Sequence, residues 1–193
     1  MNKEFWNEYF ESNAQPWTVP DAFFVAEAKG LLAGRALDLG CGEGGDSLWL
    51  AARGWDVTAV DFASAAVETL QRIATERGLS VRGVVASVLE YEHDSECDLV
   101  LMSFMHLLPG ERTKMLANAS AALAPGGILL YNGISRTTTE VDIPKELLST
   151  VDEIVADLPG LEIERAEVIP RTIAYPGAEF RVDGLIVRAR RPA

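Results

Sequence analysis

Short apolar runs alternate with helix-like periodicities from residue 35 onward, and this alternation permits few folds. The apolar runs cover 35–39, 55–60, 80–86, 98–103 and 128–133. Strands that alternate with helices form a mostly parallel sheet with the helices packed on it. The run at 98–103 is apolar through its centre, so we expect that strand to be buried on both faces. The sequence therefore predicts an α/β fold.

The segments between and after these runs complete the predicted fold. Helical spacing covers 44–53, 111–123 and 144–158, and a further helix runs from Ser64, a predicted N-cap, up to Gly78. Two β-rich segments, 161–169 and 180–188, are joined by a loop that contains Pro and Gly, and we expect them to pair as an antiparallel edge. Together these elements predict a doubly wound, mostly parallel seven-stranded sheet of the Rossmann-like kind, in a single domain.

The first 34 residues differ from the rest of the chain in their aromatic content. The aromatic side chains of this segment are Phe5, Trp6, Tyr9, Phe10, Trp17, Phe23 and Phe24. Such density is typical of helices that pack on the edge of a sheet. The alternative is a flap, or lid, that covers a bound ligand.

The charge balance argues against several classes of partner. The 193 residues include 17 Lys and Arg against 29 Asp and Glu, which gives a net charge of −12. Phosphate backbones and anionic lipid headgroups repel such a chain. The basic cluster of Arg188, Arg190 and Arg191 is more typical of a solvated end than of a nucleic-acid site. We therefore expect no nucleic-acid partner and no membrane association.

Cysteine content and the N-terminal sequence indicate a compartment. Cys41 and Cys97 are too few for a disulfide framework or a four-ligand zinc site, so we expect no metal centre. Residues 1–8 lack the basic and apolar segments of a signal peptide. The apolar run at 99–108 is far shorter than the roughly 20 residues needed to cross a bilayer. We expect a cytoplasmic protein, either a monomer or a homodimer.

The junction between the first strand and the first helix carries the strongest functional signal. Gly40, Gly42 and Gly44 stand there at alternate positions. Glycines let the backbone approach a ligand closely, and the amides at a helix start can meet its polar end. Asp61 follows the next strand, near the roughly 20-residue offset of a carboxylate that binds a ribose. These residues predict a nucleoside-binding site.

Two kinds of nucleoside cofactor fit this junction. Residues 40–45 satisfy the literal G-x-G-x-x-G pattern of dinucleotide sites, which keeps NAD(P) open. Asp38, two residues before the first glycine, favours another cofactor. Its negative charge would oppose a pyrophosphate and attract a ligand that carries an ammonium and a sulfonium.

The motifs resemble those of class I S-adenosylmethionine-dependent methyltransferases. They are Asp38-x-Gly40-x-Gly42-x-Gly44, Asp61, Asp98-Leu99-Val100 and Leu123-x-Pro125-Gly126-Gly127. More narrowly, 36–61 and 103–109 resemble small bacterial enzymes of the tellurite-resistance and thiopurine-methyltransferase-like kind. The resemblance implies S-adenosylmethionine as cofactor, S-adenosylhomocysteine as product and a small-molecule methyl acceptor. It also implies a helical segment at 1–34, a cofactor-binding core at 35–133, and a C-terminal helix with antiparallel strands at 134–193.

The resemblance assigns roles to particular positions. The loop of Gly40, Cys41, Gly42 and Gly44 would cradle the methionine part of the cofactor beside Asp38, and Asp61 would hold the ribose hydroxyls. Phe62 would lie against the adenine. Where such enzymes commonly carry an acid after the third strand this chain has Ser87, which with the Val88 backbone would hydrogen-bond the base. The remaining cofactor position is Ser103, after the fourth strand.

Transfer of an electrophilic methyl requires mainly that a nucleophile be aligned and that water be excluded. His106 follows the fourth strand, where this fold places residues that face the methyl, so we expect it to act as a base or to position the acceptor. The other candidates for the acceptor pocket are Trp17, Tyr131, Asn132 and Arg136. Cys41 is expected to be a packing residue rather than a nucleophile.

Three rival functions remain open at this point. An NAD(P)-dependent oxidoreductase could use the same glycine loop, although the chain lacks an evident Tyr-x-x-x-Lys pair. A non-catalytic S-adenosylmethionine-binding protein would bind the cofactor without turnover. A protein methyltransferase would transfer the methyl to a macromolecule.

Overall fold

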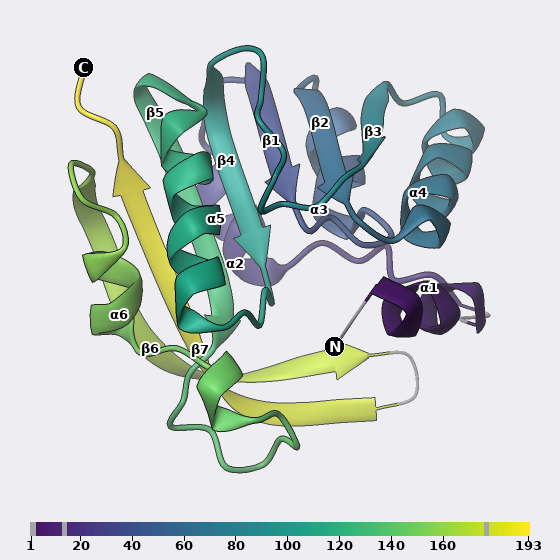
Figure 1. Ribbon diagram of the computed structural model, residues 1–193. Helices are drawn as coiled ribbons and strands as arrows, with labels where there is room; N and C mark the ends of the chain where they lie inside the picture. The colour runs from purple at the N-terminus through teal and green to yellow at the C-terminus, as the bar shows by residue number, and fades with distance from the viewer. Residues whose placement is uncertain (1–2, 13–14, 176–177) are drawn as a thin grey trace. The chain divides into compact units, whose positions relative to one another are not determined.

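The computed structural model describes residues 3–12, 15–175 and 178–193. The chain divides into two compact units, residues 1–91 and 92–193, and each is taken here by itself (Figure 1). Within the described residues no helix is long and apolar enough to span a membrane.

The first unit contains three parallel strands. They are β1 (Arg35–Leu39), β2 (Asp56–Asp61) and β3 (Val81–Val85), with β2 in the middle. The helices α3 (Gly45–Ala51) and α4 (Ser64–Glu76) connect them in turn. The strand, helix and strand alternation predicted for this part of the chain is confirmed.

The helix α4 buries the apolar residues whose helical spacing predicted it. The side chains of Ala66, Val67, Leu70, Ile73 and Ala74 are buried along one face. Three of them pack with Leu48 of α3 and Ala59 of β2 in one core cluster. Its N-cap is Ala63, so the prediction of Ser64 as the cap was wrong by one residue, because Ser64 already has helical backbone.

Two helices precede β1 among the described residues of this unit. The helix α1 (Lys3–Ser12) packs against α4, and α2 (Ala22–Ala28) is capped by Asp21, whose side chain accepts a hydrogen bond from the Phe23 amide. In α1 the ring of Trp6 stacks on Phe10, with their centroids 5.7 Å apart. The N-terminal aromatic residues other than Trp17, which lies between α1 and α2, are therefore in helices, as predicted.

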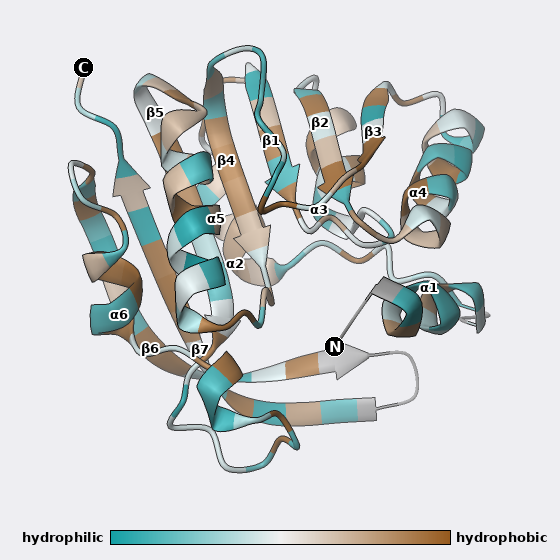
Figure 2. Ribbon diagram, in the orientation of Figure 1, coloured by the Kyte–Doolittle hydropathy of each residue, from teal (hydrophilic) through white to brown (hydrophobic). Residues whose placement is uncertain are grey.

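The second unit contains four strands. The strand β4 (Cys97–Ser103) pairs in parallel with β5 (Leu123–Ile134) through α5 (Pro109–Ala121). Strand β5 then pairs antiparallel with β7 (Ala178–Arg190), which pairs antiparallel with β6 (Glu162–Tyr175). Figure 2 shows apolar residues along β4, whose central side chains are buried. Seven strands, mostly parallel with an antiparallel edge, confirm the predicted fold class; the single domain and its internal boundaries stay predictions.

The helix predicted at 144–158 is interrupted. The structure has a short 3-10 turn, η1 (Lys145–Leu147), and then α6 (Val151–Ala156). Leu148 is extended, Ser149 bridges to Ser135, and Thr150 starts α6 with a capping box in which Glu153 takes part. The Thr-x-x-Glu spacing is a helix-start signal that the sequence contained.

The C-terminal hairpin is longer than predicted. Pro170 was expected to lie in a loop, yet it pairs with Asp183 inside β6. Since β6 is at the edge, a residue without an N–H can occupy it without breaking a ladder on both sides. In Figure 1 the distal half of the hairpin turns away from β5. The predicted connecting loop falls partly on 176–177, outside the described residues.

Candidate functional site

The loop after β1 is a tight turn made by three glycines with positive φ. Gly40, Gly42 and Gly44 have φ of 78°, 50° and 86°. Residues other than glycine rarely adopt these values. The amides of Gly40 and Cys41 both donate to the Val60 carbonyl of β2, at 2.8 and 3.1 Å. The turn is therefore anchored to the neighbouring strand and leads directly into α3.

Asp61 holds this loop from the end of β2. Its Oδ2 accepts the Gly42 amide at 3.0 Å and its Oδ1 accepts the Ala63 amide at 2.9 Å. Burial raises the pKa of the Asp61 carboxyl, and these backbone hydrogen bonds lower it in part. The sequence predicted that Asp61 lies near the glycines, but it did not predict these two hydrogen bonds. A hydrogen bond to a loop amide requires no particular residue at the amide position, so the sequence carries no pattern for it. Each carboxylate oxygen can still accept a further hydroxyl.

Asp38 is the second carboxyl of the site and is 2% exposed. Its Oδ2 accepts the Ser47 hydroxyl at 2.6 Å, across the start of α3. Burial, with a smaller contribution from the charge of Asp61, raises the pKa of Asp38 to about 7, against hydrogen bonds from Ser47 that lower it. Two buried carboxyls beside one glycine loop make surroundings that favour a cation.

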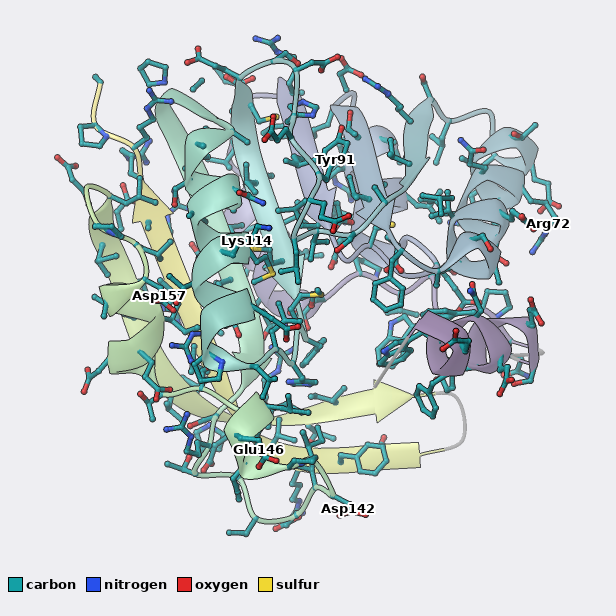
Figure 3. The ribbon with its side chains drawn as sticks, in the orientation of Figure 1. Arg72, Tyr91, Lys114, Asp142, Glu146 and Asp157 are labelled. Carbon is teal, nitrogen blue, oxygen red and sulfur yellow. The ribbon has the colours of Figure 1, made fainter. Side chains whose placement is uncertain are left out.

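The other cofactor candidates of this unit lie around the same strand ends. Ser87 begins a turn after β3: its carbonyl accepts the amides of Glu90 and Tyr91, which is labelled in Figure 3. Val88 is buried and Phe62 is half-buried. Burial, followed by the charges of Asp38 and Asp61, raises the pKa of the Cys41 thiol well above its usual value. Such a thiol is a poor nucleophile.

The N-terminal segment lies over the glycine loop. A side chain added at Gly42 would meet the Phe10 ring of α1 at 3.6 Å. Asn7 accepts from the Ala65 amide at the start of α4, at 3.4 Å. The Trp17 amide donates to Oε2 of Glu43 in the loop, at 2.7 Å. The sequence analysis named Trp17, and it named Phe10 as one of the aromatic residues of a possible flap. It missed Glu43 and the contact between Phe10 and Gly42, since nothing in their spacing ties them to the glycines.

In the second unit the segment after β4 has an unusual backbone. Phe104 has φ of 53°, and it is the one non-glycine residue with positive φ among those described. Strain of this kind is common at functional sites. The preceding Ser103 accepts from Nδ2 of Asn132 at 3.3 Å. Burial lowers the pKa of His106 to about 4, so its imidazole is neutral near pH 7 and is a weak base.

Two of the acceptor-pocket candidates have structural contacts instead. Tyr131 is 3% exposed and bonds the Ser149 side chain; burial raises its pKa to about 12. Arg136 donates to both carboxylate oxygens of Glu153 and to the Leu148 carbonyl. The guanidinium that the sequence suggested for an anionic acceptor is therefore held within α6 and its preceding turn.

Comparison with known proteins agrees with the sequence resemblance. Residues 36–127 match the family model described as "Methyltransferase domain". This range runs from β1 into β5 and includes the glycine loop, Asp61 and the segment after β4. The resemblance to class I methyltransferases is confirmed.

Two curated relatives match part of their own length. The chain is 31% identical to Hemagglutinin 1 of Eikenella corrodens over 164 residues, 82% of this chain and 55% of that protein. It is 30% identical to a ubiquinone biosynthesis O-methyltransferase of Rickettsia akari over 101 residues, 52% of this chain and 40% of that protein. The chain thus spans about half the length of the curated relatives it matches.

Solved structures share the fold. A protein described under "Conversion of a Disulfide Bond into a Thioacetal Group during Echinomycin Biosynthesis" has a TM-score of 0.82 at 24% identity, covering 98% of this chain and 91% of that one. TehB from Haemophilus influenzae has a TM-score of 0.78 at 17% identity, covering 98% of this chain and 66% of TehB. At these identities the likeness concerns the fold alone.

Proposed function

We propose that this chain, which carries a methyltransferase domain over residues 36–127, transfers a methyl group from S-adenosylmethionine to a small molecule. The first supporting argument is the pair of buried carboxyls, Asp38 and Asp61, at the glycine loop. Removing carboxylates from water is costly unless a positive charge compensates them. An ammonium or sulfonium supplies that charge, and the pyrophosphate of NAD(P) would add to the repulsion.

The residues present fit S-adenosylmethionine. The loop of Gly40, Cys41, Gly42 and Gly44 carries few side chains, and that of Glu43 is buried and accepts the Trp17 amide. Asp38 would meet an ammonium. Asp61 would accept the ribose hydroxyls. Phe62, Ser87 and the Val88 backbone would border the adenine, and Ser103 would border the reacting end. When bound, the cofactor supplies an electrophilic methyl group.

His106 contributes mainly by position in this proposal. With a pKa of about 4 it stays neutral, and one ring nitrogen can accept a hydrogen bond from an acceptor's hydroxyl, thiol or amine. Its low basicity suits an acceptor that is readily deprotonated better than one that needs a strong base.

Small-molecule specificity has two supports. The net charge of −12 disfavours nucleic acid, and one curated relative is named for ubiquinone biosynthesis. The same charge supports the expected lack of membrane association, and a cytoplasmic location remains our expectation. A monomer or homodimer remains our expectation.

Methyl transfer is tested directly with S-adenosylmethionine carrying a labelled methyl. The panel contains thiols, chalcogen oxyanions, amines and phenols, with casein and total RNA as macromolecular acceptors. We expect label in a small molecule and none in casein or RNA. Labelled protein acceptor alone would favour the protein methyltransferase, and cofactor binding without labelled product would favour a non-catalytic binding protein.

We also propose that α1 covers the cofactor. Its Phe10 ring lies against Gly42 and its Asn7 side chain contacts the start of α4. Phe10→Ala is expected to weaken binding of S-adenosylhomocysteine about three- to tenfold, roughly 1 kcal/mol, because aromatic cover over the ligand is lost. Calorimetry measures this effect.

Phe5→Ala, on an exposed part of the same helix, is the control. Equal affinities of the two variants for S-adenosylhomocysteine would contradict the proposal that α1 covers the cofactor.

A further inference from the structure

We propose that Asn132 and Arg171 are positioning residues for methyl transfer: they fix the Ser103 hydroxyl as a hydrogen-bond donor toward the methyl acceptor. This inference rests on the proposed function and deepens it, because it gives Ser103 a defined task at the reacting end. The strand registers place Ser103, Asn132 and Arg171 on one face of the sheet. Ser103 is the last residue of β4 and pairs with Asn132 of β5.

The Arg171 side chain reaches Asn132 by crossing a neighbouring strand. Its Nη1 donates to Oδ1 of Asn132 at 2.9 Å, although β7 lies between β6 and β5 (Figure 1). Gly184 of β7 leaves the space for this path, since a Cβ there would stand 2.9 Å from Cγ of Arg171 and still closer to its Cδ. The guanidinium carbon also lies 5.9 Å from the ring centroid of Phe104, within the range of a cation–π contact. The guanidinium is therefore held at the ends of β4 and β5.

The chemistry of the guanidinium determines the orientation of the Asn132 amide. An arginine side chain has N–H donors and no acceptor, so the atom of Asn132 that faces it must be the oxygen. The Nδ2 of Asn132 then donates to Oγ of Ser103, at 3.3 Å. Asn132 is 0% exposed, so its side chain is not available to the methyl acceptor. We therefore infer that Asn132 acts through Ser103.

The Ser103 hydroxyl keeps its hydrogen for another partner. A hydroxyl has one donor and two acceptor lone pairs, and Asn132 occupies one of these lone pairs. Among the residues that the structure describes, none accepts a hydrogen bond from this hydroxyl. Ser103 is half-buried, and the strand ends there because Phe104 has φ of 53°. The hydroxyl can therefore donate to a bound ligand.

A donor at this place favours an acceptor atom that has two lone pairs. One lone pair of an oxygen or sulfur atom can accept the Ser103 hydrogen while the other faces the methyl group. A neutral amine nitrogen has a single lone pair, which it must use for the attack. Holding the reacting atoms in line contributes strongly to the rate, so the loss of such a contact slows transfer. We therefore expect oxygen or sulfur acceptors to react faster than amines.

The first test examines the contact between Arg171 and Asn132 in the full chain, without cofactor or acceptor. Asn132→Asp keeps the shape and places a carboxylate beside the guanidinium. In that background Arg171→Met leaves a buried carboxylate unpaired, so it should lower the melting temperature by roughly 5 to 10 °C at pH 8. In the wild-type background the same change should cost less than half as much. Equal losses in the two backgrounds would overturn the contact.

Arg165→Met is the matched control for this test. Arg165 is on the same strand and pairs with Glu167 at the surface, 2.6 Å away. Its substitution should shift the melting temperature by the same small amount in both backgrounds.

The second test measures methyl transfer to the best acceptor of the labelled-methyl panel. In Asn132→Asp the new carboxylate oxygen accepts the Ser103 hydroxyl, which withdraws the donor from the acceptor, and Ser103→Ala removes the hydroxyl. Each variant should lower kcat about five- to fiftyfold. The double variant should lose no more than Ser103→Ala alone, because both changes remove one hydrogen bond. Losses that multiply would overturn the inference.

Two comparisons separate positioning from a general structural role. Arg171→Lys still presents only donors to Asn132, so it should restore most of the kcat that Arg171→Met loses. A phenol and the aniline of the same skeleton are also compared, and the wild-type preference for the phenol should shrink in Asn132→Asp and in Ser103→Ala.

The two proposals fail in distinguishable ways. Affinity for S-adenosylhomocysteine should stay within about twofold of wild type in all these variants. Absence of transfer by wild type to every acceptor would refute the proposed function and the role of Ser103 with it. Intact transfer with an unchanged kcat in Asn132→Asp would refute only the positioning role.

Discussion

Replacing Gly44 with alanine is expected to lower the free energy of unfolding by about 2 to 5 kcal/mol, as measured by urea denaturation. Two terms add. The φ of 86° costs a non-glycine residue roughly 1 to 2 kcal/mol. The new Cβ would also overlap Leu70, which is fully buried in the core of the first unit, and such overpacking costs about 1 to 3 kcal/mol.

Gly54→Ala is the matched control for this prediction. Gly54 has nearly the same φ, 85°, but no atom lies within 4 Å of a Cβ placed there. Its substitution should therefore show the backbone term alone, about 1 to 2 kcal/mol. If both variants lose the same stability, Leu70 does not pack under the glycine loop as described.

The second large effect concerns Asp38→Asn, which should weaken binding of S-adenosylmethionine about ten- to a hundredfold at pH 8. A hydrogen bond to a charged group is worth about 1.5 to 3 kcal/mol, and asparagine keeps the shape while losing the charge. Asp56→Asn, at the exposed start of β2, is the control. Calorimetry should show unchanged affinity for that variant.

The dependence on pH follows from the raised pKa of Asp38. Below about pH 7 the carboxyl is protonated and neutral, so wild type should bind the cationic cofactor more tightly as the pH rises from 5.5 to 8.5. Because the folded pKa lies above the unfolded value of about 3.9, protonation stabilises the cofactor-free protein. That stability is complete below pH 4 and is lost as the pH rises through 7. Asp61, also raised, contributes in the same direction.

Asp38→Asn should flatten both pH profiles. The buried Cys41 thiol beside the two acids stays protonated across this range, so it adds no charge of its own. A wild-type affinity that does not change between pH 5.5 and 8.5, or an equal slope in Asp38→Asn, would contradict the role of this carboxyl.

Local patterns predicted the parallel strands well, and long-range contacts explain the misses. Strand β1 has the predicted bounds, and α4 follows the spacing of Val67, Leu70 and Ile73. The helix predicted at 144–158 breaks because Ser149 bridges to Ser135, a pairing that the local sequence does not contain. Likewise, Pro170 suggested a loop, and only the position of β6 at the edge makes it acceptable in a strand.

In the candidate site, too, local patterns predicted some features, and others depend on long-range contacts. Glycine spacing and the offset of Asp61 predicted the loop and the carboxylate that the structure brings together. The partners of the arginines could not be predicted: Arg136 donates to Glu153, and Arg171 reaches Asn132 across Gly184 of β7. These contacts depend on strand order, and that order is a property of the folded chain.

The central claim, a cationic methyl-donor cofactor at the glycine loop, is tested most directly by calorimetry on the purified chain. S-adenosylmethionine, S-adenosylhomocysteine, NAD and NADP are titrated in turn at pH 8. We predict saturable one-to-one binding of the first two and no measurable heat from NAD or NADP. Tight binding of NAD or NADP, without binding of S-adenosylhomocysteine, would contradict the account.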